Sequence, residues 1–235
     1  GAPYDSSFVR QIEKRLHEDS VDISVYNFGM SGSDPIYYYT MLRDSLLQYK
    51  PTHVIFCPNR TDIEDVLMRG GMERFNADGT TSYKKSPWFH PLYQHSHFVR
   101  FAMIDILKYD ALLIKKSQRE DLNQIALDQI FQSQELASTL CKENGIQFKV
   151  ITHMMPGAAC AGEFDNKYIM ALTPTNASYP MIRIAEQFSA VAQDEHCKEI
   201  GWPIDGHFTS FGYQILGDLI YEEIKADFQD TPKEY

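Results

Sequence analysis

The sequence has no long apolar run and no basic cluster. No stretch approaches the roughly 20 apolar residues that a membrane-spanning helix needs, and the N-terminal residues lack the basic start and apolar run of a secretory leader. The formal net charge is −10, from 32 Asp and Glu against 22 Lys and Arg. Because phosphate binding needs clustered Lys and Arg, we expect no nucleic-acid partner. Because no apolar run is long enough, we also expect no membrane span.

Spacings typical of metal, redox and phosphate sites are also missing. The four cysteines (Cys57, Cys141, Cys160 and Cys197) form no C-x-x-C pair and no metal-ligand rhythm with histidine, which predicts free thiols and no metal. Cys160 and Cys197 both fall in or near late loops and could pair in an oxidising compartment. A Gly-rich phosphate loop is absent, which argues against a flavodoxin-like phosphate or nucleotide binder.

Alternating strand and helix patterns indicate an α/β protein. With 235 residues and 43% hydrophobic content, the chain is long enough to bury one substantial core, and we expect a single domain over residues 1–235. The predicted strands are residues 21–28, 53–57 and 146–151, and the predicted helices are residues 7–17, 36–49, 97–115, 121–141, 181–194 and 211–228. Such an order favours a mainly parallel sheet, which binds ligands beyond the carboxyl ends of its strands.

The run Asp205-Gly206-His207 is the strongest candidate for chemistry. It precedes an amphipathic helix, and an i, i+2 spacing in extended chain can aim both side chains the same way. A carboxylate so placed can orient the imidazole of a histidine general base and stabilise the imidazolium that forms. The same tripeptide also fits an ordinary Asp-Gly turn with a polar residue beside a helix.

The wider context favours the catalytic interpretation. The run from His207 through Phe211, Gly212 and Tyr213, followed by an apolar helix, resembles the last motif block of SGNH (GDSL-like) hydrolases. This resemblance implies a three-layer α/β/α sandwich with a flavodoxin-like sheet. Many members place the Asp three residues before the His and others place it two before, so Asp205 and His207 fit a variant of this block.

Two further blocks of the family have counterparts here. Residues 25–32 look like the second block, in which a strand runs into a glycine that supplies an oxyanion-hole amide; by position that glycine is Gly32, with Gly29 behind it. The third block places an Asn after a buried strand. Here Asn59 is the only nearby Asn, while ungapped counting points to Thr61, and both assignments stay open.

The family's first block, a strand ending in Gly-Asp-Ser, has no counterpart. Ser6 and Ser7 stand directly before the first predicted helix, where the residue types favour helix capping over a nucleophile. Either the chain starts downstream of its natural beginning, or it is a relative that has lost this block. We expect the former, because the missing strand lies inside the family's sheet.

The resemblance implies ester hydrolysis or acyl transfer. His207 would be the general base, Asp205 would orient it, and Gly32 and Asn59 would form the oxyanion hole, without a metal or other cofactor. The implied partner is an acylated small molecule, carbohydrate or lipid. We expect residues 1–235 by themselves to be inactive, and the alternative is a non-catalytic SGNH-like binding domain.

Overall fold

The computed structural model describes residues 3–30, 32–163, 167–174, 176–193, 197–204 and 206–229, without the side chains of Tyr168 and Ile169. The chain forms two compact units. Unit 1 comprises residues 1–31, 50–60 and 138–235, and unit 2 comprises residues 32–49 and 61–137. The expectation of a single SGNH-like domain over residues 1–235 stays a prediction.

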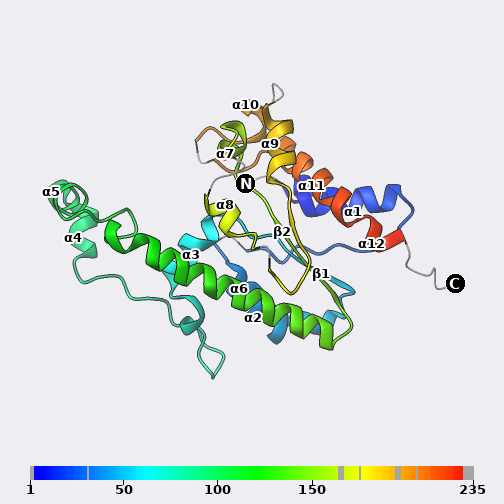
Figure 1. Cartoon of the computed structure of the whole chain (residues 1–235), viewed down its shortest axis with the longest axis horizontal. Helices are drawn as coiled ribbons and strands as arrows, with labels where there is room; N and C mark the ends of the chain where they lie inside the picture. Colours follow the sequence, from blue (N-terminus) through cyan, green and yellow to red (C-terminus); the bar gives the residue numbers. More distant parts are fainter. Residues whose placement is uncertain are drawn as a thin grey trace. The chain divides into compact units, whose positions relative to one another are not determined.

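Unit 1 contains a small parallel sheet with helices around it (Figure 1). Its strands are β1 (His53–Phe56), β2 (Gln147–Thr152) and β3 (Met181–Arg183), in the order β1-β2-β3. Its helices are η1 (Tyr4–Ser6), α1 (Phe8–Glu18), α7 (Pro156–Cys160), α8 (Lys167–Ala171), α9 (Ala185–Gln193), α10 (Cys197–Ile200), α11 (Ser210–Ile224) and α12 (Ala226–Gln229). The predicted mixed α/β class with a parallel sheet is therefore confirmed.

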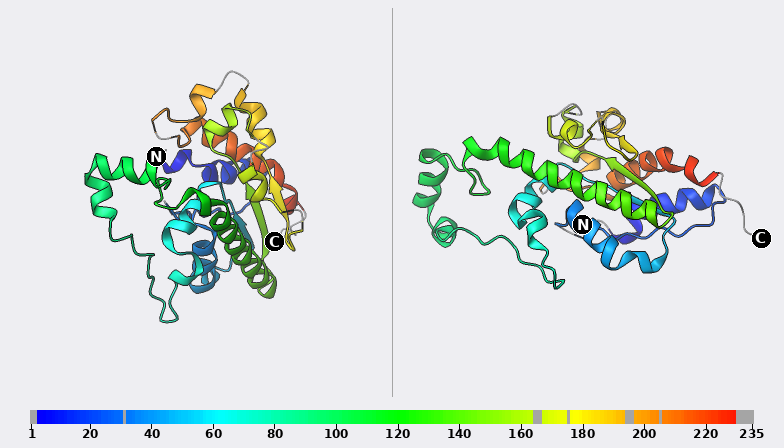
Figure 2. Two further views of the ribbon diagram at one scale, coloured as in Figure 1. Left: turned by 60° about the vertical axis from the view of Figure 1, so that its left-hand side comes forward. Right: turned by 60° about the horizontal axis from the view of Figure 1, so that its bottom comes forward.

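Unit 2 is helical apart from its connections (Figures 1 and 2). Its elements are α2 (Pro35–Asp44), η2 (Leu46–Tyr49), α3 (Thr61–Arg69), η3 (Gly71–Arg74), α4 (His90–His95), α5 (His97–Phe101), the π-helical turn η4 (Ala102–Ile106) and η5 (Lys116–Gln118). Helix α6 (Arg119–Glu143) begins in unit 2 and ends in unit 1. Within the described residues, no helix is both long and apolar enough to cross a membrane.

The core of unit 1 lies between the sheet and helices α1, α9 and α11. Phe188 of α9, Ile151 of β2 and Leu216 of α11 are almost completely buried in it. Helices α1 and α11 approach closely at Gly217, where a Cβ atom would lie 2.8 Å from the Gln11 Cβ and 3.0 Å from the Phe8 carbonyl oxygen. A larger residue at this position would force the two helices apart.

The cap of α1 follows the sequence-based expectation, whereas the prediction of free thiols is wrong for two of the four cysteines. The Ser7 side chain caps α1 by accepting a hydrogen bond from the Arg10 amide at 3.3 Å, as predicted from its position before the helix. Cys160 and Cys197 form a disulfide between α7 and α10, with Cα atoms 5.4 Å apart. Cys57 and Cys141 keep their thiols, and burial raises the pKa of the Cys141 thiol to about 11.

The predicted strand at residues 21–28 is wrong, because this segment forms no ladder with the sheet. Val21, Ile23 and Val25 pack against the core, while the residues between them are exposed. The side chains thus alternate as in a strand, yet the Val25 amide donates to the Glu13 carboxylate at 3.0 Å. A side chain of α1 therefore satisfies the Val25 amide, which in a strand would bond to a neighbouring strand.

The helix predicted over residues 97–115 is shorter, because α5 and η4 end at Ile106. Two further elements differ from the sequence-based prediction. Residues 181–183 were predicted as the start of a helix but form strand β3, because they pair with residues 150–152 of β2. The sequence pattern of residues 58–62 is typical of a polar loop, but α3 begins at Thr61 and buries Ile63, Val66 and Leu67. In both cases contacts with distant residues decide the local structure.

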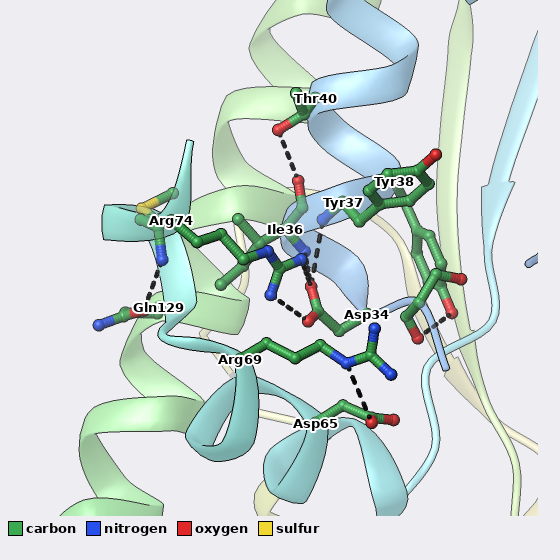
Figure 3. Close-up of polar contacts among 11 residues, drawn as sticks. Asp34, Ile36, Tyr37, Tyr38, Thr40, Asp65, Arg69, Arg74 and Gln129 are labelled. Atoms are coloured by element: carbon green, nitrogen blue, oxygen red, sulfur yellow. Dashed lines mark hydrogen bonds and ion pairs between the residues drawn. The ribbon is translucent and has the colours of Figure 1, made fainter. Parts of the chain in front are cut away.

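A buried ion pair stabilises the interior of unit 2 (Figure 3). Arg74 donates to both Asp34 carboxylate oxygens, at 2.6 and 2.9 Å, and both side chains are almost fully buried. Asp34 also caps α2 by accepting from the amides of Ile36 and Tyr37, both at 3.1 Å. The carboxylate therefore connects the start of α2 to the end of η3, and its charge is balanced by the guanidinium.

We expect Arg74→Met to lower the free energy of unfolding by about 3–5 kcal/mol, because it leaves the Asp34 carboxylate buried without its counter-charge. Urea denaturation followed by circular dichroism measures the change. The control is Arg43→Met, which breaks an exposed pair with Asp44 and should cost less than about 1 kcal/mol. Equal losses in the two variants would contradict the role assigned to the buried pair.

Candidate functional site

The carboxyl ends of the parallel strands in unit 1 form the candidate site. β2 pairs in parallel with β1 and with β3, so all three strands end at the same edge of the sheet. Asn59 lies in the loop after β1 and is half-buried, and His153 follows β2 directly. Polar groups from two neighbouring strands are thus positioned where open α/β sheets bind ligands.

The loop that carries His207 is held by backbone hydrogen bonds. The His207 carbonyl accepts from the Trp202 amide at 2.8 Å, and the Trp202 carbonyl accepts from the Gly206 amide at 3.0 Å. The Thr209 side chain then caps α11 by accepting from the Gly212 amide at 3.1 Å. The His207 side chain is exposed to solvent. The geometry fixes its backbone directly before a capped helix.

His153 is a candidate site residue that sequence reasoning missed. It is buried, and its ring centroid lies 5.9 Å from that of Phe208, the residue after His207. Its Nδ1 lies 3.4 Å from the Met154 carbonyl oxygen, to which a protonated Nδ1 donates. Burial lowers the pKa of His153, which favours the neutral ring. The only sequence signal was a histidine at the end of an apolar strand.

The contact between His153 and Phe208 connects the end of β2 to the loop that carries His207. Phe208 is buried and also lies against Phe188 of α9, with ring centroids 5.6 Å apart. Through this aromatic contact the His207 loop is attached to the carboxyl end of β2. The His207 loop therefore contacts the edge of the sheet at which β1 and β2 end, and Asn59 lies in the loop after β1.

Gly32 belongs to unit 2, and its backbone conformation favours glycine. Its φ is +69°, and a Cβ atom would lie only 2.2 Å from Nη2 of Arg69. The Arg69 Nε donates to Asp65 at 3.4 Å (Figure 3). Burial raises the pKa of Asp65 although Arg69 opposes the shift. The positive φ accounts for a glycine at this position, and its role as an oxyanion-hole donor stays a prediction.

The remaining predicted residues have different outcomes. Asp205 lies outside the described residues. The Gly29 amide donates to the Asn27 side chain at 2.9 Å, so this amide already has an acceptor. Thr61 is the first residue of α3 in unit 2, whereas Asn59 lies in unit 1. The choice between Asn59 and Thr61 stays open.

Among the described residues, neither a metal-ligand group nor a surface hollow adds a residue to the candidate site. No group of three or more His, Cys, Asp or Glu side chains within the described ranges is arranged to hold a metal ion. A surface hollow of about 550 Å³ lies along α1 and includes none of the predicted site residues. It is lined by Asp5, Arg10, Gln11, Lys14, His17 and Glu18. A scan of protein-family models and searches of curated proteins and solved structures found no match for this chain.

We expect His153 to make folding sensitive to acid. The folded-state pKa of His153 lies below the ordinary value of 6.5, so protonation favours the unfolded chain. The contribution of His153 to the free energy of unfolding is fully present above about pH 6.5. It falls with decreasing pH, by at most about 1.4 kcal/mol per pH unit. His153→Gln removes the titration and should flatten the profile of unfolding free energy between pH 7.5 and 5.5.

The matched control is His95→Gln, because His95 is exposed on α4. His53, whose pKa is also lowered by burial, acts in the same direction and remains in both variants. The informative quantity is therefore the difference between the two profiles. Parallel profiles for His153→Gln and the wild-type chain would show that His153 protonates without cost.

Proposed function

We propose that this chain is most of an SGNH-type serine ester hydrolase or acyl transferase, acting on an acylated small molecule, carbohydrate or lipid. The observation that carries the proposal is the position of His207. Its loop is closed by backbone hydrogen bonds, stands before the capped helix α11 and is attached through Phe208 to the end of β2. This is an appropriate place for a general base in a parallel α/β sheet.

In the proposed reaction His207 accepts the proton of a serine hydroxyl as that oxygen attacks the ester carbonyl. The imidazolium then donates this proton to the leaving alcohol, which releases it and leaves an acyl-enzyme for water or an acceptor alcohol to resolve. Asp205 orients the imidazole. The amide of Gly32 and the side chain of Asn59 are the assigned donors to the oxyanion, with Thr61 as the alternative to Asn59.

We assign the missing nucleophile to one further strand beside β1. In the described chain β1 pairs only with β2, which leaves its other edge open. Ile55 of β1 and the alternating side chains of residues 21–25 pack against the same core. A strand inserted between them would complete the backbone hydrogen bonding of both and extend the small sheet toward a three-layer α/β/α sandwich.

The test has two parts, beginning with residues 1–235. This chain should hydrolyse p-nitrophenyl acetate no faster than buffer, since it supplies no Gly-Asp-Ser strand. Turnover by this chain that His207→Ala abolishes would show that a serine within residues 1–235 is the nucleophile. Reading the coding sequence before Gly1 then decides whether a strand ending in Gly-Asp-Ser is present.

For a natural polypeptide that includes such a strand, His207→Ala should lower kcat/KM for the ester by about 10³-fold or more. His95→Ala, on the exposed face of α4, should leave it unchanged. A coding sequence without this strand, or a polypeptide in which His207→Ala has no effect, would instead support the non-catalytic binding domain.

A further inference from the structure

A group of exposed aromatic and aliphatic side chains gathers on one part of unit 2. They fall within residues 83–118, which we call the basic aromatic segment and which includes α4, α5 and η4. Trp88 and Phe98 are the most exposed, at 84% and 76%. The full set is Tyr83, Trp88, Leu92, Phe98, Phe101, Ile106 and Leu107. Apolar side chains concentrated in this way mark an interaction surface.

The charge of this segment is opposite to that of the chain. It contains six Lys and Arg residues against only Asp105 and Asp110, although the whole chain has a net charge of −10. The basic residues are Lys84, Lys85, Arg100, Lys108, Lys115 and Lys116. Positive charge is therefore concentrated among the exposed apolar side chains, which selects for a negatively charged partner.

The exposed side chains belong to a folded segment. The Asp110 carboxylate accepts from the amides of Leu112 and Ile114 and from Arg119 of α6 at 2.6 Å. Met103 and Ile114, which belong to the segment, are buried. Helices α4 and α5 lie near the first turns of α6 (Figures 1 and 2). The segment therefore presents its apolar side chains to solvent from an anchored base.

We infer that the basic aromatic segment docks onto the surface of an anionic lipid bilayer. Trp and Phe side chains favour the interfacial region of a bilayer, and Leu and Ile side chains gain from contact with acyl chains. Lysines beside them are attracted to anionic headgroups. The aliphatic members Leu92, Ile106 and Leu107 favour a lipid over a nucleic acid, whose bases are bound by stacking on aromatic rings.

The geometry fits interfacial binding. Helix α4 has six residues, and α5 continues into η4 over residues 97–106, so both helical stretches are far shorter than a membrane-spanning helix and can place side chains among headgroups without crossing the membrane. This inference is independent of the proposed hydrolase activity and of His207. The experiment below therefore measures binding only, and its result does not depend on whether the chain is an enzyme.

The test is partitioning of the chain into vesicles of phosphatidylglycerol and phosphatidylcholine. Trp88 is one of only two tryptophans, so Trp202→Phe leaves it as the sole reporter. We expect sedimentation with vesicles containing phosphatidylglycerol, a blue shift of Trp88 fluorescence and quenching by brominated acyl chains. Binding should weaken on addition of salt and be at least tenfold weaker to pure phosphatidylcholine.

Two pairs of variants separate this surface from general stickiness. Lys84→Gln with Lys85→Gln should lower the partition coefficient on the order of tenfold, whereas Lys142→Gln with Lys198→Gln, at exposed lysines of unit 1, should not. Phe98→Ser should weaken binding by a similar factor. Its control, Ile204→Ser, removes a side chain that is 96% exposed outside the segment.

Three results would overturn the inference. The first is no sedimentation with anionic vesicles, and the second is equal losses in the segment variants and their controls. The third is a concentration-dependent dimer without lipid that Phe98→Ser dissociates, because the surface would then be an interface between two copies of the chain. Circular dichroism of each variant verifies that the fold is retained.

Discussion

The parallel pairing of β2 with β1 on one side and β3 on the other determines the organisation of unit 1. Because these strands run in the same direction, every segment that follows them emerges at one edge, and the connecting helices must return along the faces. Asn59, His153 and the aromatic contact that holds the His207 loop are consequences of this direction. An antiparallel pairing of the same sequence segments would scatter these residues to opposite ends of the sheet.

The elements that could be predicted from sequence are those with strong local signals. Helix α1 has a capping serine and regular apolar spacing, and β1, β2, α6 and α11 have long apolar runs or stripes with clear ends. Residues 21–28 have the side-chain alternation of a strand, but a strand also needs a neighbour with which to form hydrogen bonds. Strand β3 shows the converse: three residues with no local pattern form a strand because β2 is beside them.

The candidate site likewise contains residues with a local sequence signal and residues whose environment depends on distant contacts. The sequence around His207 has a recognisable order of residue types, so its loop before α11 could be anticipated. The burial of His153 could not, because it depends on Phe208, which is more than fifty residues away in the chain. Likewise, the glycine at position 32 was apparent, whereas the arginine packed against it lies on a helix that was not predicted.

The contact between Gly32 and Arg69 has a consequence for mutational scanning. Any side chain at position 32 must shift the end of the Arg69 side chain and adopt a left-handed backbone conformation, which costs a non-glycine residue about 1 kcal/mol or more, so most substitutions there should score as destabilising. Such intolerance would resemble that of a catalytic position even if the amide never contacted a substrate. Shortening Arg69 in the same chain relieves the steric part of the defect, so a scan in that background distinguishes crowding from chemistry.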